Sequence, residues 1–235
     1  MLLKACLNGG VRRAEHPAVP ITPAELATDA ARCRLVGALA VHVHPRDRDG
    51  RESLAGPDIA AAVDAIRRAC PGLPVGVSTG AWIEPEPAAR VAAVRGWTVL
   101  PDFASVNAHE PGAELVAGAL HERGVGVEAG VWTVEAAADY RRWRVPCLRV
   151  LVECMRPEPA DALADAAAIL GTLPVDAPPV LLHGEGPATW AVLAEAVRRG
   201  LATRMGLEDI RTLPDGSPAA GNAELVAAAV ALGAG

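Results

Sequence analysis

Three consecutive stretches near the N-terminus decide the fold: TPAELATDAARCRL (22–35), AVHVHP (40–45) and PDIAAAVDAIRRA (57–69). The first opens with the capping-box pattern of Thr22 and Glu25, with proline at the first helical position, which predicts a helix start. The third repeats apolar residues at helical spacing, as at Ile59 and Val63. The middle stretch is short and alternating. The unit therefore predicts a helix, a strand and a second helix.

The same alternation continues along the whole chain. We expect strands at residues 2–8, 40–45, 74–80, 103–107, 126–132, 148–153, 180–186 and 203–208. Helical stretches follow them at 22–35, 57–69, 87–98, 112–123, 133–143, 159–171, 187–200 and 222–232. Strand–helix units in this number predict an α/β fold, a parallel (β/α)8 TIM barrel that forms a single domain over residues 1–235.

A doubly wound open sheet is the competing fold, because it also alternates strands with helices. Such a sheet usually has fewer units, or a glycine-rich nucleotide loop after its first strand. The NGG at residues 8–10 does not match the G-x-G-x-x-G pattern of that loop. The barrel is therefore the favoured prediction.

Composition excludes several classes of function. Hydrophobic residues make up 51% of the 235 residues but aromatics only 3%, so Ala, Val and Leu must build the core. The net charge of −6 comes from scattered charges of both signs, which argues against a nucleic-acid partner. No apolar run reaches the 18 residues of a membrane span, and residues 1–10 do not resemble a signal peptide. The five cysteines include no C-x-x-C pair, which indicates reduced thiols in a cytoplasmic protein.

Two histidines at the end of the second expected strand indicate a metal site. Alternation places His42 and His44 on one face of the strand, and active sites of such barrels lie at the carboxyl ends of the strands. Two imidazoles and one carboxylate suit zinc or another divalent ion with positions left open. Glu208 is the favoured third ligand, because strand 8 lies two places from strand 2 in a closed barrel; His183 and Glu185 are the alternatives. The histidines can also be two unconnected polar residues.

Other polar residues gather where the expected strands end. Ser78 and Thr79 are either turn residues before a glycine or ligand contacts. Glu128 either faces the site or pairs with an arginine of a neighbouring strand. On strand 8 we expect Arg204 and Glu208 to share one face. The remaining residues of this kind are Ser105 and Asn107 on strand 4, Asp209 just past strand 8, and Arg12 and Arg13, which form either a solvated face or an anion clamp.

Several of these stretches together resemble the β-keto acid cleavage enzyme family, whose best-known type is the 3-keto-5-aminohexanoate cleavage enzyme. The stretches are ACLNGG (5–10), PITPAELA (20–27), VHVHPRDRDGRESL (41–54), VGVSTGAW (75–82), FASVN (103–107) and RMGLEDIRTLPDGSPAAGNAELV (204–226). The resemblance implies a zinc-bearing barrel that converts a β-keto acid and acetyl-CoA into acetoacetate and a new acyl-CoA. It also implies a homo-oligomer.

The resemblance assigns roles to matching residues of this chain. It implies that a metal is bound by His42, His44 and Glu208, and that Arg204 and Asp209 are the catalytic arginine and acid. It implies contacts with the carboxylate or keto group of the substrate for Ser78, Ser105 and Asn107, and matches Glu128 to an acidic position on strand 5. On chemical grounds a carboxylate beside the metal can take a proton from the methyl group of acetyl-CoA, and we expect Asp209 to do so.

Two departures from the family pattern concern the substrate. Family members have a glutamate in the loop after strand 1, whereas this chain has Gly9, Gly10 and Val11 there, and the connections between strands 4 and 7 are short. Both features leave the identity of the keto acid open. One alternative function is a non-catalytic barrel that keeps its metal and binds a keto acid or acyl-CoA. A second is an amidohydrolase-type hydrolase, but that class carries its histidine pair on strand 1, and this chain has none there.

Overall fold

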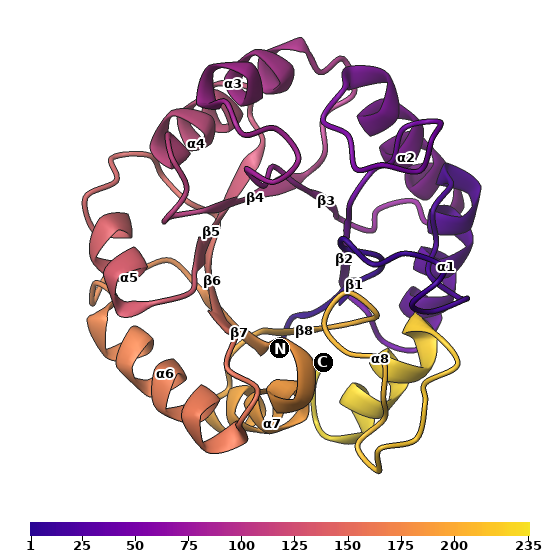
Figure 1. Cartoon of the computed structure of the whole chain (residues 1–235), viewed down its shortest axis with the longest axis vertical. Helices are drawn as coiled ribbons and strands as arrows, with labels where there is room; N and C mark the ends of the chain where they lie inside the picture. Colours follow the sequence, from indigo (N-terminus) through magenta and orange to yellow (C-terminus); the bar gives the residue numbers. More distant parts are fainter.

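The computed structural model describes residues 1–235 and shows eight parallel strands arranged as a barrel (Figure 1). The order of hydrogen-bonded strands is β7-β6-β5-β4-β3-β2-β1-β8. The strands are β1 (Leu3–Cys6), β2 (Ala40–Val43), β3 (Val75–Ser78), β4 (Phe103–Asn107), β5 (Gly126–Val131), β6 (Arg149–Cys154), β7 (Val180–Gly184) and β8 (Thr203–Met205). Each lies within one residue of the range expected from the sequence, or inside it.

The barrel closes between its last two strands. β1 pairs with β2 on one side and with β8 on the other. The gap from β7 to β8 is bridged by Leu181 and Ala202, and the Leu182 N–H donates to the Ala202 carbonyl at 2.9 Å. The prediction of a single-domain TIM barrel is confirmed.

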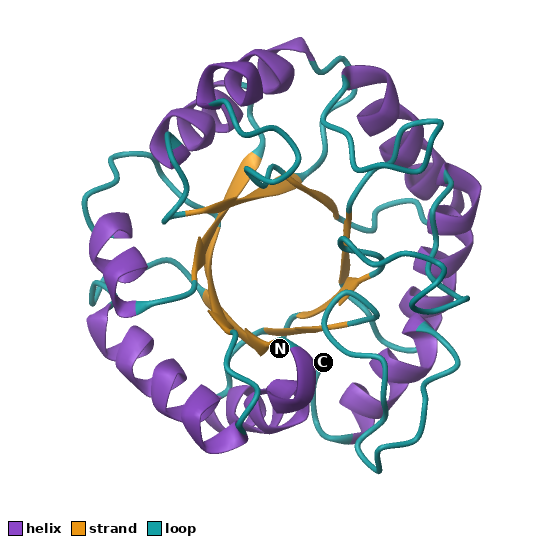
Figure 2. Ribbon diagram, in the orientation of Figure 1, coloured by secondary structure: helices purple, strands orange, loops and turns teal.

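Eight helices surround the barrel, as Figure 2 shows. At the start of α1 the Thr22 hydroxyl accepts from the Glu25 N–H at 3.3 Å, and the Glu25 carboxylate accepts from the Thr22 N–H at 2.9 Å, so the predicted capping box is present. A short 3-10 turn, Gly186–Ala188, precedes α7. The helices are α1 (Pro23–Leu35), α2 (Gly56–Ala69), α3 (Pro87–Gly96), α4 (Ala113–Glu122), α5 (Val134–Tyr140), α6 (Pro159–Thr172), α7 (Thr189–Arg199) and α8 (Asn222–Ala231).

The main core lies between the strands and the surrounding helices. Val41 and Val43 of β2 belong to one buried cluster with Ile59 and Val63 of α2. Because neighbouring side chains on a strand point to opposite faces, the same pattern turns His42 toward the interior of the barrel. Aliphatic burial on the outer face of β2 thus fixes the direction of a polar residue on its inner face.

The end of β8 differs from the sequence prediction. The strand stops at Met205, and Glu208 and Asp209 follow on a turn rather than on an extended strand. The Leu207 N–H donates to the Asn222 side chain at 2.7 Å instead of to a neighbouring strand, so the ladder cannot continue. None of the helices is both long and apolar enough to cross a membrane.

Candidate active site

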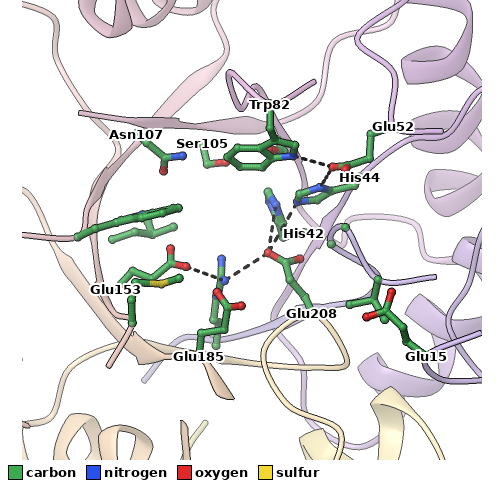
Figure 3. Close-up of a pocket in the computed structure, with 18 of the residues that line it drawn as sticks. Glu15, His42, His44, Glu52, Trp82, Ser105, Asn107, Glu153, Glu185 and Glu208 are labelled. Carbon is green, nitrogen blue, oxygen red and sulfur yellow. Dashed lines mark hydrogen bonds and ion pairs between the residues drawn. The ribbon is translucent and has the colours of Figure 1, made fainter. Parts of the chain in front are cut away.

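A cavity of about 440 Å³ opens at the carboxyl ends of the strands (Figure 3). Its lining comes from nearly every strand end and from the loops after them, so the fold converges on one place. The lining includes Gly9, His42, His44, Glu52, Ser78, Trp82, Ser105, Asn107, Trp132, Leu151, Glu153, Met155, Glu185, Arg204 and Glu208.

Three possible metal ligands meet on one side of the cavity, and we call His42, His44 and Glu208 the metal corner. One ligand atom from each lies within 4.8 Å of the others. The Nε2 atoms of His42 and His44 lie 4.0 Å and 3.7 Å from the Glu208 Oε1. Tetrahedral zinc with bonds of about 2.0–2.2 Å keeps its ligands at roughly this spacing. The residues expected from the sequence are therefore brought together.

The charges of the metal corner and its neighbours set the protonation of the three possible ligands. Burial lowers the pKa of His42 well below its ordinary value, so its imidazole is neutral and can donate a lone pair. Burial alone would lower the pKa of His44 also, but the carboxylates of Glu208 and Glu52 raise it to about 9. Without an ion His44 is therefore protonated near neutral pH, and binding of a metal at Nε2 would release that proton. The pKa of Glu208 is lowered well below its ordinary value, because Arg204 and both histidines outweigh its burial. An ionised carboxylate beside two imidazoles is a donor set that suits a divalent ion.

Arg204 and Asp209 extend the polar network from the metal corner into the barrel. Arg204 donates to the Asp209 Oδ1 through Nε at 3.0 Å and Nη2 at 2.7 Å, and its Nη2 lies 3.3 Å from the Glu208 Oε1. Arg204 lines the cavity, whereas Asp209 lies behind it and has a buried Oδ2 with no hydrogen-bond partner. Burial, with Glu208 and Glu153, raises the pKa of Asp209 to about 8 against the opposing effect of Arg204.

The ends of β3 and β4, which follow β2 in the barrel, bring neutral polar groups into the cavity. Ser78, Ser105 and Asn107 all line it, and the Asn107 amide donates to Glu110 at 2.9 Å. Thr79 does not line it: its side chain is fully buried, and its hydroxyl donates to the Ser105 carbonyl at 2.7 Å. The turn interpretation of Thr79 therefore describes its place in the structure. An apolar part of the lining is formed by Trp132, Leu151 and Met155.

Known proteins resemble this chain over all or part of its length. A family model described as beta-keto acid cleavage enzyme matches residues 1–234. The chain belongs to this family. Relatives named 3-keto-5-aminohexanoate cleavage enzyme, from Fusobacterium nucleatum and Acetoanaerobium sticklandii, are each 33% identical over 81 residues. That match covers 34% of this chain and 30% of each relative, so the chain matches under a third of their length.

Solved structures share the barrel of this beta-keto acid cleavage enzyme family member. A ternary complex of ObcA with a C4-CoA adduct and oxalate has a TM-score of 0.69 and 19% identity, covering 90% of this chain and 62% of that one. A 3-dehydroquinate dehydratase from Geobacillus kaustophilus has a TM-score of 0.63 and 12% identity, covering 98% and 89%. At such low identity these likenesses show the fold alone.

The loop after β1 of this family member packs directly on the metal corner. Gly9 has a φ of +47°, and a side-chain carbon there would lie 2.5 Å from the Glu208 Cγ. Glycine at this position therefore lets the loop pass close to the metal ligand. The departure from the family's glutamate in this loop thus coincides with a contact that shapes the position of Glu208.

Glu128 lies below the cavity rather than in its wall. Its carboxylate binds the Lys4 ammonium at 2.5 Å and faces Arg149 at 3.3 Å, and both cations lie over the Phe103 ring. We call Lys4, Phe103, Glu128 and Arg149 the floor cluster. The sequence prediction of a substrate contact for Glu128 does not match this place, whereas the alternative, an ion pair with a neighbouring strand, is what the structure shows.

The remaining sequence candidates divide between interior and surface. His183 is buried below the cavity, with its Nε2 3.3 Å from Glu153 and its Nδ1 4.0 Å from Asp209. Glu185 lines the cavity but does not approach the metal corner closely enough to join the ligand set. Arg12 and Arg13 pair with Glu15 and Glu25 on the exposed surface, so they form no anion clamp at the cavity.

The sequence analysis missed three acidic residues that line the cavity, Glu15, Glu52 and Glu153. Glu52 contacts His44, and Glu153 faces Arg204 at 3.8 Å. A signal for Glu153 was present, since it ends the sixth strand as other cavity residues end theirs. Glu52 lies in a loop eight residues after His44, and periodicity does not predict the path of a loop.

Proposed function

We propose that this protein is a divalent-metal-dependent enzyme that cleaves a β-keto acid with acetyl-CoA, giving acetoacetate and a new acyl-CoA, with zinc as the metal. The observation that carries the proposal is the metal corner, in which two imidazoles and a carboxylate converge at the mouth of a family barrel. The names of the relatives, 3-keto-5-aminohexanoate cleavage enzymes, support the same class of substrate.

The metal corner would hold the ion through His42, His44 and Glu208. When bound, a divalent ion supplies Lewis-acid polarisation of a carbonyl oxygen and favours development of negative charge on it. Ser78, Ser105 and Asn107 would hold the carboxylate of the keto acid, since they are the neutral polar side chains that line the cavity. The apolar surface of Trp132, Leu151 and Met155 would then contact the distal part of the substrate.

Proton transfer in this proposal belongs to Arg204 and Asp209. Asp209 would take a proton from the α-carbon of the keto acid rather than from the acetyl-CoA methyl group, because only a bond between that α-carbon and the acetyl carbonyl leads to acetoacetate. This addition would release the CoA thiolate, which would then add to the former keto carbon. The bond between that carbon and the α-carbon would break, giving the new acyl-CoA, and the acetoacetate carbanion would take the proton back from Asp209. A pKa of about 8 suits a general base near neutral pH. Arg204 lines the cavity and binds Asp209, which lies behind it, so the guanidinium would have to move for the Asp209 Oδ2 to reach the substrate. The positive charge of Arg204 would then stabilise the developing anion.

The test combines product analysis with one variant. Purified protein loaded with zinc is incubated with acetyl-CoA and a panel of β-keto acids, and acetoacetate and the new acyl-CoA are measured by mass spectrometry. Asp209→Asn should retain zinc and lose turnover by about 100-fold or more, the usual contribution of a general base. Full turnover in that variant removes the role of Asp209.

Binding of acyl-CoA or keto acid without any product would instead make the protein a metal-containing binding barrel. The homo-oligomer that the family implies is a separate part of the proposal. Light scattering on the same sample tests it.

A further inference from the structure

Glu52 joins a proposed metal ligand to the wall of the cavity. Its Oε1 lies 2.5 Å from the His44 Nδ1 and also accepts from the Trp82 indole N–H at 3.1 Å (Figure 3). One carboxylate oxygen therefore contacts residues from two different strand ends. Neither contact is explained by the cleavage mechanism proposed above.

The backbone holds Glu52 firmly in place. The loop after β2 folds back on itself, so that Arg46 and Glu52 form an antiparallel bridge and the Ser53 N–H donates to the Pro45 carbonyl at 2.9 Å. The Arg46 side chain joins the same loop to the loop after β1 by donating to the Gly9 carbonyl at 2.6 Å. The position of the carboxylate is thus set by backbone pairing and not by its own contacts alone.

Trp82 packs beside the metal corner in a space that the neighbouring residues leave open. Its ring is stacked on His44, with centroids 6.2 Å apart and planes inclined by 20°. A side-chain carbon at Gly80 would lie 2.3 Å from the indole, so the glycine leaves the space that the ring occupies. The indole N–H is then aimed at Glu52 and the ring forms part of the cavity wall.

We propose that Glu52 is a positioning residue that orients His44 for the metal and anchors Trp82 as the adjoining wall of the substrate cavity. This inference rests on the proposed function, because it takes the metal corner as the ligand set. An ionised carboxylate accepts hydrogen bonds and does not donate them, so the His44 Nδ1 carries the hydrogen. The Nε2 is thereby the atom left for the metal, and it already faces Glu208 at 3.7 Å.

The arrangement makes two separable predictions. Loss of the Glu52 carboxylate frees the His44 ring to rotate and weakens metal binding. Hydrogen bonds that orient a metal ligand in this way contribute about 10–100-fold to metal affinity. Loss of the indole N–H alone leaves His44 oriented but releases Trp82 from Glu52. Glu52 therefore acts on both the metal and the substrate, and Trp82 on the substrate alone.

The experiment measures zinc affinity by competition with a chelator in the full chain, together with the visible spectrum of the cobalt-substituted protein. Glu52→Ala should bind zinc about 10–100-fold more weakly and change the cobalt spectrum, and Glu52→Gln, which keeps an acceptor, should recover part of the loss. Glu185→Ala is the matched control, because it removes an equal charge from the same cavity without touching a ligand. Its zinc affinity should match the wild type.

A second pair of measurements separates the two roles. Trp82→Phe keeps an aromatic ring but loses the N–H, and it should keep zinc affinity while raising the KM for the β-keto acid with little change in kcat. Equal zinc affinity and an unchanged cobalt spectrum in Glu52→Ala, with the wild type binding zinc normally, would overturn the inference and leave the proposed function intact. A wild type that binds no metal would instead remove the proposed function itself.

Discussion

The barrel interior buries charge at two levels, the floor cluster and the metal corner, and the two differ in what their charges face. In the floor cluster Lys4 and Arg149 both face the carboxylate of Glu128, so every charge meets an opposite charge of the protein itself. In the metal corner, ligand atoms of His42, His44 and Glu208 converge on one another. The buried cations of the floor cluster therefore have a partner within the protein, whereas the metal corner has the arrangement that the proposed cation would need.

The same comparison explains why only one of the clusters belongs to the cavity. Phe103 lies against both cations of the floor cluster, at 5.4 Å from the Lys4 ammonium and 5.3 Å from the Arg149 guanidinium. The ring and the ion pairs together fill the lower barrel. All three members of the metal corner line the cavity. A charged residue inside a barrel therefore indicates a binding site only where its ligand atoms face the cavity.

Among variants that distinguish the two clusters, we expect Glu208→Gln to have the largest effect on turnover. Turnover should fall by about 1,000-fold or more, because Lewis-acid stabilisation is worth several kcal/mol. Folding of the metal-free protein should change little, since Arg204 keeps Asp209 as a partner and His44 keeps Glu52. Steady-state kinetics and urea unfolding of the metal-free protein measure the two quantities. Retained turnover would show that Glu208 is not a necessary ligand.

Glu128→Gln should give the opposite pattern. It leaves Lys4 fully buried without its carboxylate partner, which lowers the free energy of unfolding by about 3–5 kcal/mol. Protein that remains folded should still bind zinc, because no member of the floor cluster belongs to the ligand set. Urea unfolding and metal analysis on the same sample check this. If stability were unchanged and zinc were lost, Glu128 would belong to the functional site after all.

The double variant Lys4→Met with Glu128→Leu tests whether the floor cluster contributes more to stability than charge compensation. Replacing a buried ion pair by apolar residues of similar volume is often neutral or stabilising, so the pair should recover most of the stability lost in Glu128→Gln. The shared partner Arg149 is 14% exposed at its side chain and can turn toward solvent. A double variant no more stable than the single one would show that the floor cluster contributes more than charge compensation.

We expect the smallest effect on stability from a surface carboxylate, Glu25, which serves as a reference for the two buried clusters. The Thr22 N–H and the Arg13 guanidinium lower the pKa of Glu25 from 4.5 to about 2. Its stabilising effect is therefore present above pH 4.5 and is lost as the pH falls through about 2. Glu25→Gln should cost at most about 1 kcal/mol at pH 7, because the group is partly exposed. The difference from the wild type should vanish near pH 2 in thermal unfolding scans.

The sequence predicted those parts of the molecule that depend on periodicity. Alternation placed His42 inside the barrel because Val41 and Val43 had to be buried outside it. The direction of Glu208 could not be derived in the same way. β8 stops at Met205, and Glu208 reaches the metal corner on a turn held by Asn222, a residue of α8 that is distant in the sequence.

Contacts that strand periodicity does not describe explain the other differences between the sequence predictions and the structure. Glu128 has the spacing of a residue that faces the cavity, and only its contact with Lys4, 124 positions away, reveals that it belongs to the floor cluster. Glu52 enters the cavity through the backbone pairing of its loop with Arg46. Strand periodicity alone therefore predicts neither position, because that of Glu128 depends on Lys4 of a distant strand and that of Glu52 on the path of its own loop.

The metal content of the purified protein tests the central claim most directly. We predict a single zinc ion per chain in the wild type and in Glu128→Gln, and its loss in His42→Ala, as measured by mass spectrometry of the metal. That result would establish that open and self-compensated buried charges have different roles here. Zinc retained in His42→Ala, or absent from the wild type after zinc reconstitution, would contradict the account.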